Sequence, residues 1–325
     1  MASSVLTELI AERGVLLVDG ATGTQLMAAG LEPGDAPERL NLDKPEAVYR
    51  LHEAYVNAGS DIVLTNTFGG SAYRLKLHKL DDRVVEINRE AARHARHVVD
   101  QLDRRVLVAG SMGPTGELLA PLGTLEPHDA ASAFADQAQG LTEGGADVLW
   151  IETMSSMEEI EAAIEGARSS SDLPIAVTLS FDTAGRTMMG VDGTTAGRRL
   201  AELEVDAMGA NCGNNLVDTE AALGQMVAVA GGIPIISKAN AGIPQWRGAE
   251  LIYSGTPDIA AAHADRVRSQ GVQIIGGCCG NEPEHLARMR AVLDGTIPVP
   301  DVGHVVPDGP VAVDAPRQRR GRRRR

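Results

Sequence analysis

Eight short runs of β-branched and other apolar residues alternate along the chain with longer amphipathic segments, and this alternation constrains the fold most strongly. The amphipathic segments, such as residues 45–59 and 81–102, repeat their apolar residues at helical spacing, and several end in glycine, as helices often do. Strands that alternate with helices form parallel βαβ units. We expect strands at residues 15–19, 61–66, 105–110, 147–152, 174–180, 206–211, 234–239 and 272–277.

Eight such units fit a single-domain (β/α)8 barrel, or TIM barrel, over residues 1–296. The alternative is a doubly wound open sheet, which would place its ligand at one switch point of the strand order. Glycine-rich and polar residues instead follow nearly every predicted strand. In a closed barrel all eight strand ends meet at one mouth, where active sites lie. The pattern therefore favours the barrel.

The C-terminal segment, residues 297–325, differs in composition from the rest of the chain. It is rich in Pro, Val and Asp and ends in an arginine cluster at 317–325 that holds seven of the 30 basic residues. Residues 1–316 therefore have 23 basic against 44 acidic residues, a net charge of −21. We expect the tail to be disordered and solvated. The acidic body argues against nucleic acid as a partner.

The chain carries no pattern typical of export or of a membrane span. No apolar run reaches the roughly 18–20 residues that cross a bilayer, and the N-terminus lacks a signal peptide's basic start and apolar stretch. Three cysteines are too few for a disulfide scaffold. We therefore expect a cytoplasmic protein without membrane contact. A homo-oligomer stays open.

All three cysteines follow predicted strands. Cys212 follows the sixth strand, and Cys278 and Cys279 follow the eighth, so a barrel would bring the three sulfurs to one mouth. Three thiolates form a soft site, and Zn²⁺ commonly takes three protein ligands and keeps a fourth position for chemistry. None of the eight histidines follows a predicted strand directly. The alternatives are a vicinal disulfide, small buried apolar side chains, or a glycine-rich phosphate loop.

The segments that follow the strands resemble those of the homocysteine S-methyltransferases, a family of zinc-dependent barrels. The resemblance extends over residues 13–295, and its motifs are DGATGTQL, TNTFGG, AGSMGPTGE, WIET, SFDTAGRTMMG, GANCG, NAGIP and IIGGCCGNEPEHL. Within this family, the chain is most similar to the short bacterial betaine–homocysteine methyltransferases. The segments that carry this similarity are GDAPE, YRLKLH, SFDTAGRTMMGV and the arginine-rich tail. The resemblance implies transfer of a methyl group from betaine to homocysteine, giving methionine and dimethylglycine.

The family resemblance also implies a role for individual residues. The three cysteines would hold zinc as the cofactor, and the homocysteine sulfur would take the fourth position, which Asn240 fills when substrate is absent. Asp19 and Glu152 would bind the ammonium group of homocysteine, although both could instead cap helix starts. Backbone amides of the glycine-rich loops would receive its carboxylate, near Gly20, Gly23 or Ser111.

The methyl donor is the least constrained part of the prediction. Aromatic faces bind quaternary ammonium groups well, and four aromatic residues could form a partial cage: Phe68, Phe181, Trp246 and Tyr253. Thr153 departs from the family pattern, since the animal betaine enzymes have a tyrosine there. The alternative donors are S-methylmethionine, a methylated corrinoid protein and dimethylsulfoniopropionate. A non-catalytic zinc-sensing or thiol-sensing protein that signals through its tail is the alternative outside enzymes.

Overall fold

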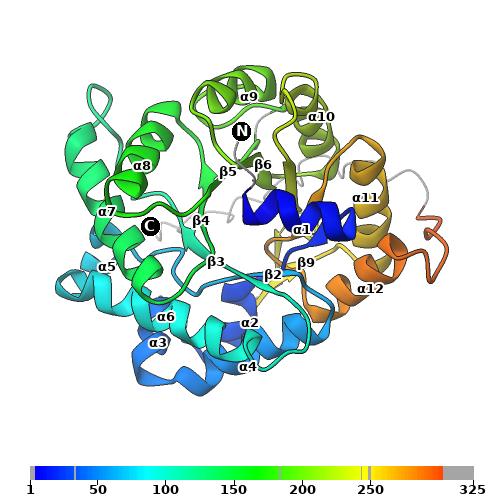
Figure 1. The fold of residues 1–325 in the computed structure, drawn as a ribbon, viewed down its shortest axis with the longest axis horizontal. Helices are drawn as coiled ribbons and strands as arrows, with labels where there is room; N and C mark the ends of the chain where they lie inside the picture. The colour runs from blue at the N-terminus through cyan, green and yellow to red at the C-terminus, as the bar shows by residue number, and fades with distance from the viewer. Residues whose placement is uncertain (1–3, 33, 183, 243, 248–249, 303–325) are drawn as a thin grey trace, which may run out of the picture.

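Eight parallel strands surround a common axis in the computed structural model, which describes residues 4–32, 34–182, 184–242, 244–247 and 250–302 (Figure 1). The strands are β1 (Leu16–Leu17), β2 (Ile62–Leu64), β3 (Leu107–Met112), β4 (Val148–Met154), β5 (Ile175–Leu179), β6 (Ala207–Cys212), β7 (Ile235–Ala239) and β10 (Ile274–Gly277). They pair in the order β1-β10-β7-β6-β5-β4-β3-β2, and a parallel bridge between Val18 and Ile62 closes the ring. The predicted (β/α)8 barrel and its eight strands are confirmed.

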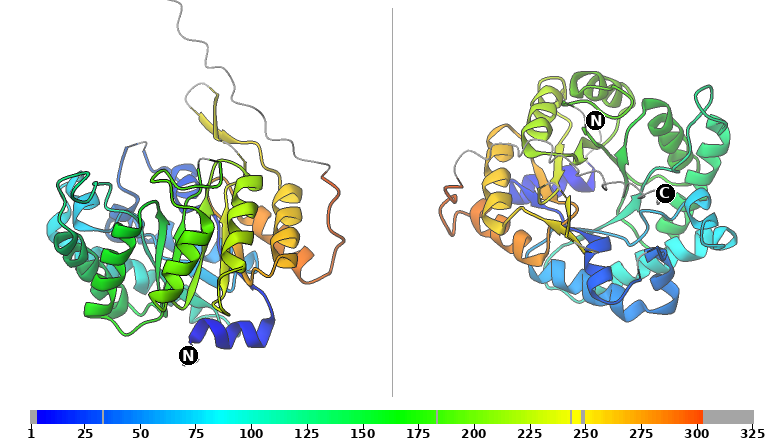
Figure 2. Two further views of the ribbon diagram at one scale, coloured as in Figure 1. Left: turned by 90° about the horizontal axis from the view of Figure 1, so that it is seen from above. Right: turned by 180° about the vertical axis from the view of Figure 1, so that it is seen from behind.

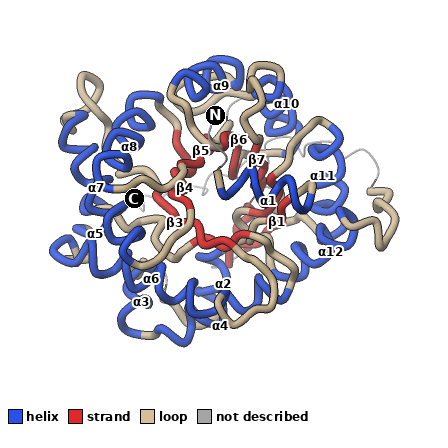
Figure 3. The backbone as a smooth tube through the Cα atoms, viewed as in Figure 1, coloured by secondary structure: helices blue, strands red, loops and turns tan. Residues whose placement is uncertain are grey.

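Helices form a continuous outer layer around the strands (Figure 3). They are α2 (Thr22–Ala28), α3 (Leu40–Asp43), α4 (Pro45–Asn57), α5 (Ala72–Lys76), α6 (Val84–Val99), α7 (Pro127–Glu143), α8 (Met157–Ser170), α9 (Gly193–Glu202), α10 (Leu216–Val227), α11 (Pro257–Ser269) and α12 (Pro283–Leu293), with 3-10 turns at Pro37–Arg39 and Asp81–Arg83. Side-chain caps fix several starts: Ser156 accepts from the Glu159 amide, and Thr256 from the Ile259 amide.

The strands alternate between two apolar cores. In β4, Val148 and Trp150 point into the barrel, whereas Leu149 and Ile151 pack against the surrounding helices. This period of two follows from the pleat of a strand. It places the next inward residue of β4, Glu152, just above the interior core at the carboxyl ends of the strands. The polar residues of the mouth therefore rest on a fully buried apolar floor.

The opposite end of the barrel is covered by helix α1 (Val5–Arg13). Leu6 and Leu9 are fully buried and belong to the same cluster as the inward residues of the strands. The apolar side chains of α1 thus seal this end of the barrel. Figure 2 shows α1 at one end of the molecule and a β-hairpin at the other.

That hairpin, β8 (Pro244–Arg247) and β9 (Glu250–Tyr253), is antiparallel and was not predicted. It follows β7 on the mouth side of the barrel. The side chain of Trp246, one of the four predicted cage residues, lies outside the described part of the chain.

The structure describes only the first residues of the predicted tail. Residues 298–302 have no regular secondary structure, and residues 303–325 lie outside the described residues. Among the residues that the structure describes, we find no helix with both the length and the apolar character needed to span a bilayer.

Removal of the α1 seal should weaken the fold. Leu9→Ala leaves a cavity at a fully buried site, and we expect it to lower the free energy of unfolding by about 2–5 kcal/mol in a urea titration. Leu122→Ala is the matched control: Leu122 is 70% exposed, so its loss should change that free energy by less than about 0.5 kcal/mol. Equal effects of the two substitutions would contradict the role given to α1.

Candidate active site

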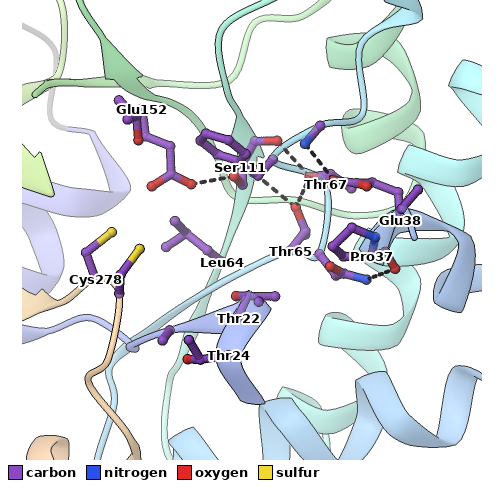
Figure 4. A pocket seen from close by; sticks show the side chains of 18 of the residues that line it. Thr22, Thr24, Pro37, Glu38, Leu64, Thr65, Thr67, Ser111, Glu152 and Cys278 are labelled. Carbon is purple, nitrogen blue, oxygen red and sulfur yellow. Dashed lines mark hydrogen bonds between the residues drawn. The ribbon is translucent and has the colours of Figure 1, made fainter. Parts of the chain in front are cut away.

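A cavity of about 540 Å³ opens at the mouth of the barrel (Figure 4). Cys278 and Glu152 lie at one end of the cavity, which we call the inner end, and Glu38 lies at the opposite end, which we call the outer end. Its walls come from the segments that follow β1, β2 and β10, together with residues of β3, β4, β6 and β7 and Tyr253 of the hairpin.

Strand register brings the three cysteines together. Cys212 of β6 and Gly277 of β10 both pair with Ala239 of β7, which lies between them. Cys278 directly follows Gly277, and its Sγ lies 3.0 Å from the Sγ of Cys212. All three sulfurs lie within 4.8 Å of one another.

The sulfur triangle suits one tetrahedral metal ion. Sulfurs bound to Zn²⁺ at about 2.3 Å lie about 3.8 Å apart in a tetrahedron. Here Cys212 and Cys278 have their sulfurs 3.0 Å apart, and no two of the three sulfurs are more than 4.8 Å apart, so small movements would fit them to one ion. The three thiols also interact directly: hydrogen bonds from Cys212 and Cys278 hold the pKa of Cys279 well below its usual value. Hydrogen bonds with Cys278 and Cys279, together with burial, raise the pKa of Cys212.

Asn240 connects the two loops that carry the cysteines. Its Nδ2 donates to the carbonyl of Gly213 at 3.0 Å, and its Oδ1 accepts from the amide of Cys279 at 3.0 Å. Both ends of the amide are thus engaged with backbone, and Asn240 does not line the cavity. The structure places it behind the sulfurs.

Asn211, which sequence reasoning missed, braces the site from β6. Its Oδ1 accepts from the Thr153 amide and the Thr178 hydroxyl, each at 2.8 Å, while its Nδ2 donates to the Thr153 hydroxyl at 2.6 Å. Nδ2 also lies 3.5 Å from the sulfur of Cys212. Thr153 and Cys212 both have positive φ, 62° and 58°, which costs non-glycine residues energy. Asn211 holds both strained residues in place.

A buried cation lies at the inner end of the cavity. Lys238 of β7 is 2% exposed, and its Nζ donates to Asp19 Oδ1 at 2.9 Å. Burial lowers the pKa of Lys238, but the carboxylates of Asp19 and Glu152 outweigh burial and the net shift is upward. Asp19 Oδ2 also accepts from the Leu64 amide at 2.7 Å. Lys238 stays protonated and fixes Asp19 in place.

Glu152 is the second buried carboxylate. It is 7% exposed, and its Oε1 accepts from the Ser111 hydroxyl at 2.5 Å (Figure 4). Burial raises the pKa of Glu152 to about 7, and the nearby charge of Lys238 opposes that rise only in part. Near neutral pH this carboxylate therefore gains most from a second cation, such as the ammonium group of a ligand.

The predicted site residues separate into two groups. Those that line the cavity are Cys212, Cys278, Cys279, Gly20, Gly23, Ser111, Glu152, Phe68 and Tyr253. Asp19 lies behind Lys238 rather than in the wall, and Phe181 is 1% exposed and does not line the cavity. Gly20 is needed for packing, since a Cβ there would lie 2.3 Å from the carbonyl oxygen of Asn281.

Further lining residues escaped the sequence analysis. Thr24 of α2 has a buried hydroxyl with no hydrogen-bond partner among the described residues. One sequence feature could have identified Lys238. It is the only charged residue in the apolar strand 234–239, and it lies two positions after the inward-facing Ile236. Glu38, Arg74 and His78 lie on loops and helix ends whose approach to the mouth no local pattern predicts.

Lys238→Met should destabilise the protein strongly. It would leave Asp19 and Glu152 buried without a cation, and we expect the free energy of unfolding to fall by about 3–5 kcal/mol in a urea titration. The double variant Lys238→Met/Asp19→Asn removes one of the two charges and should recover part of that loss. An unchanged unfolding midpoint for Lys238→Met would refute this description of the charge cluster.

Comparison with known proteins places this site in a family. The sequence profile of the homocysteine S-methyltransferases matches residues 16–293. The chain is 33% identical to the methionine synthases of Mycobacterium leprae and Mycobacterium tuberculosis, matching 90% and 89% of its own length but only 26% and 25% of theirs. It therefore spans about a quarter of these relatives.

A solved structure agrees with the sequence match. The homocysteine methyltransferase MmuM from Escherichia coli superposes with a TM-score of 0.72 in both its oxidised and its metallated form. The oxidised form is 25% identical and the match covers 89% of this chain and 99% of that one; the metallated form is 24% identical, with 88% and 99% covered. This chain belongs to the homocysteine S-methyltransferase family, whose enzymes methylate homocysteine.

Proposed function

We propose that the protein is a zinc-dependent methyltransferase that transfers a methyl group from betaine to homocysteine. The observation that carries this proposal is the triangle of Cys212, Cys278 and Cys279 sulfurs at the inner end of a cavity that also holds a buried carboxylate and a buried lysine. Zinc bound by three thiolates lowers the pKa of an incoming thiol and keeps it ionised at neutral pH.

Homocysteine would be held at the inner end by its two charged groups. Glu152 would bind the ammonium group, and Ser111 would keep the Glu152 carboxylate oriented through their 2.5 Å hydrogen bond. The carboxylate would lie against the first turn of α2, whose amides at Gly23 and Thr24 have no partner within the helix. The unpaired Thr24 hydroxyl supports this placement. Asp19 acts indirectly, by holding Lys238.

Methyl transfer needs no general base from the protein. The homocysteine sulfur, already a thiolate, attacks a methyl carbon of betaine, so one C–S bond forms and one C–N bond breaks. The electron pair of the broken bond stays on nitrogen, which gives methionine and dimethylglycine. Phe68, which is 40% exposed, and Tyr253 both line the cavity and offer aromatic faces to the quaternary ammonium group.

The proposal extends to the organisation of the chain. We propose that residues 1–296 form the catalytic domain and that residues 297–325 take no part in catalysis. The three thiols are usable only where they stay reduced, so we place the reaction in the cytoplasm.

Removal of one sulfur ligand tests the metal site. Cys279→Ser should lower the zinc content from about one ion per chain to a small fraction and should abolish methionine formation, because a neutral hydroxyl replaces a thiolate ligand. Zinc is measured by elemental analysis of the purified protein, and folding by circular dichroism. Full activity of Cys279→Ser would disprove a catalytic zinc site here.

A panel of donors tests the finer assignment. Purified, zinc-loaded protein is given homocysteine with betaine, S-methylmethionine, dimethylsulfoniopropionate or a methylated corrinoid protein, and methionine is quantified. We expect the highest kcat/KM with betaine. Turnover with another donor and none with betaine would refute betaine as substrate but keep homocysteine as the acceptor.

A further inference from the structure

The outer end of the cavity carries a cation that the protein itself does not use. Arg74 of α5 and His78, one turn later, both line the cavity and belong to the YRLKLH segment, residues 73–78. Among the described residues, Arg74 donates no hydrogen bond and makes no ion pair within 4.0 Å, whereas most arginines of this barrel make at least one such contact. A half-buried guanidinium without a partner is open to a ligand.

A buried carboxylate faces the same space. Glu38 is 5% exposed, and its Oε1 accepts from the Gly69 amide at 2.6 Å. Burial raises the pKa of Glu38, and the charges of Arg74 and His78 only partly oppose that rise. Glu38 and Arg74 are thus close enough to interact electrostatically without forming a salt bridge. The outer end therefore presents both signs of charge.

The inner charges cannot serve a second ligand. Lys238, the other cation that lines the cavity, is already paired with Asp19 and lies beside Glu152. The anionic group of a second ligand therefore meets Arg74 as the available guanidinium or ammonium group among the described residues of the wall. A guanidinium suits this task, because its planar fork donates two parallel hydrogen bonds to one carboxylate.

We propose that Arg74, assisted by His78, binds the carboxylate of the methyl donor, so that the donor must be an onium compound that also bears a carboxylate. This inference rests on the proposed function, because it takes the bound molecule to be the methyl donor. With the carboxylate held at Arg74, the onium group extends toward the sulfurs and stays within the field of Glu38. Betaine, dimethylsulfoniopropionate and S-methylmethionine belong to this class, whereas choline, which has the same trimethylammonium group as betaine but no carboxylate, does not.

Kinetics of charge-removal variants test the role of Arg74. Arg74→Gln should raise the KM for betaine about 10- to 100-fold, the usual effect of losing a charged hydrogen-bonded pair, and leave the KM for homocysteine and the zinc content unchanged. Lys76→Gln is the matched control, because it removes the same charge from the same helix at an exposed residue outside the cavity wall. Arg74→Gln kinetics that equal those of Lys76→Gln would overturn the inference.

Direct binding separates this inference from the proposed function. Betaine and choline are titrated into zinc-loaded wild-type protein and into Arg74→Gln, with binding followed by calorimetry. The inference is supported if the wild type binds betaine tightly, if Arg74→Gln weakens that binding, and if both proteins bind choline weakly. This holds even if no methionine forms, because the absence of methionine would refute only the proposed function. The inference would be overturned if the wild type bound betaine and choline equally, or did not bind betaine. Homocysteine methylation from another donor could still be measured in that case.

Discussion

The register of three neighbouring strands determines the site. Because Ala239 pairs with Cys212 on one side and with Gly277 on the other, the ends of β6 and β10 are level with each other across β7. The backbone then completes the arrangement: the Cys278 amide donates to the Ala239 carbonyl at 2.9 Å, and the Ala241 amide to the Cys279 carbonyl at 2.9 Å. A shift of one residue would turn side chains to the other face of the sheet and separate the sulfurs.

Two sets of charged side chains line the cavity, one at each end. At the inner end, Lys238 neutralises Asp19 and leaves Glu152 with a raised pKa, which suits the ammonium group of an amino acid next to the sulfurs. At the outer end, Arg74 and Glu38 present opposite charges that do not neutralise each other in a salt bridge. Under the proposed function, this separation would accommodate two zwitterionic substrates, with homocysteine at the inner end and the methyl donor toward the outer end.

The sequence predicted what depends on local periodicity and failed where distant segments meet. Each strand could be found because β-branched runs and glycine stops recur at regular spacing, and each cysteine could be placed at the mouth because it follows a strand. The pairing of Lys238 with Asp19 joins residues 219 positions apart, so no local pattern reports it. Asn211 was missed for the same reason, since its partners lie on β4 and β5. The hairpin escaped because its first strand, residues 244–247, contains no β-branched residue.

Zinc K-edge X-ray absorption of the full-length protein, recorded before and after homocysteine is added, tests the central claim most directly. Three thiolate ligands predict three sulfurs at about 2.3 Å from zinc with a lighter atom in the fourth position. Addition of homocysteine should replace that atom by a fourth sulfur at a similar distance. Fewer than three sulfurs in the first spectrum, or no increase in sulfur in the second, would contradict the account of how this family member activates its substrate.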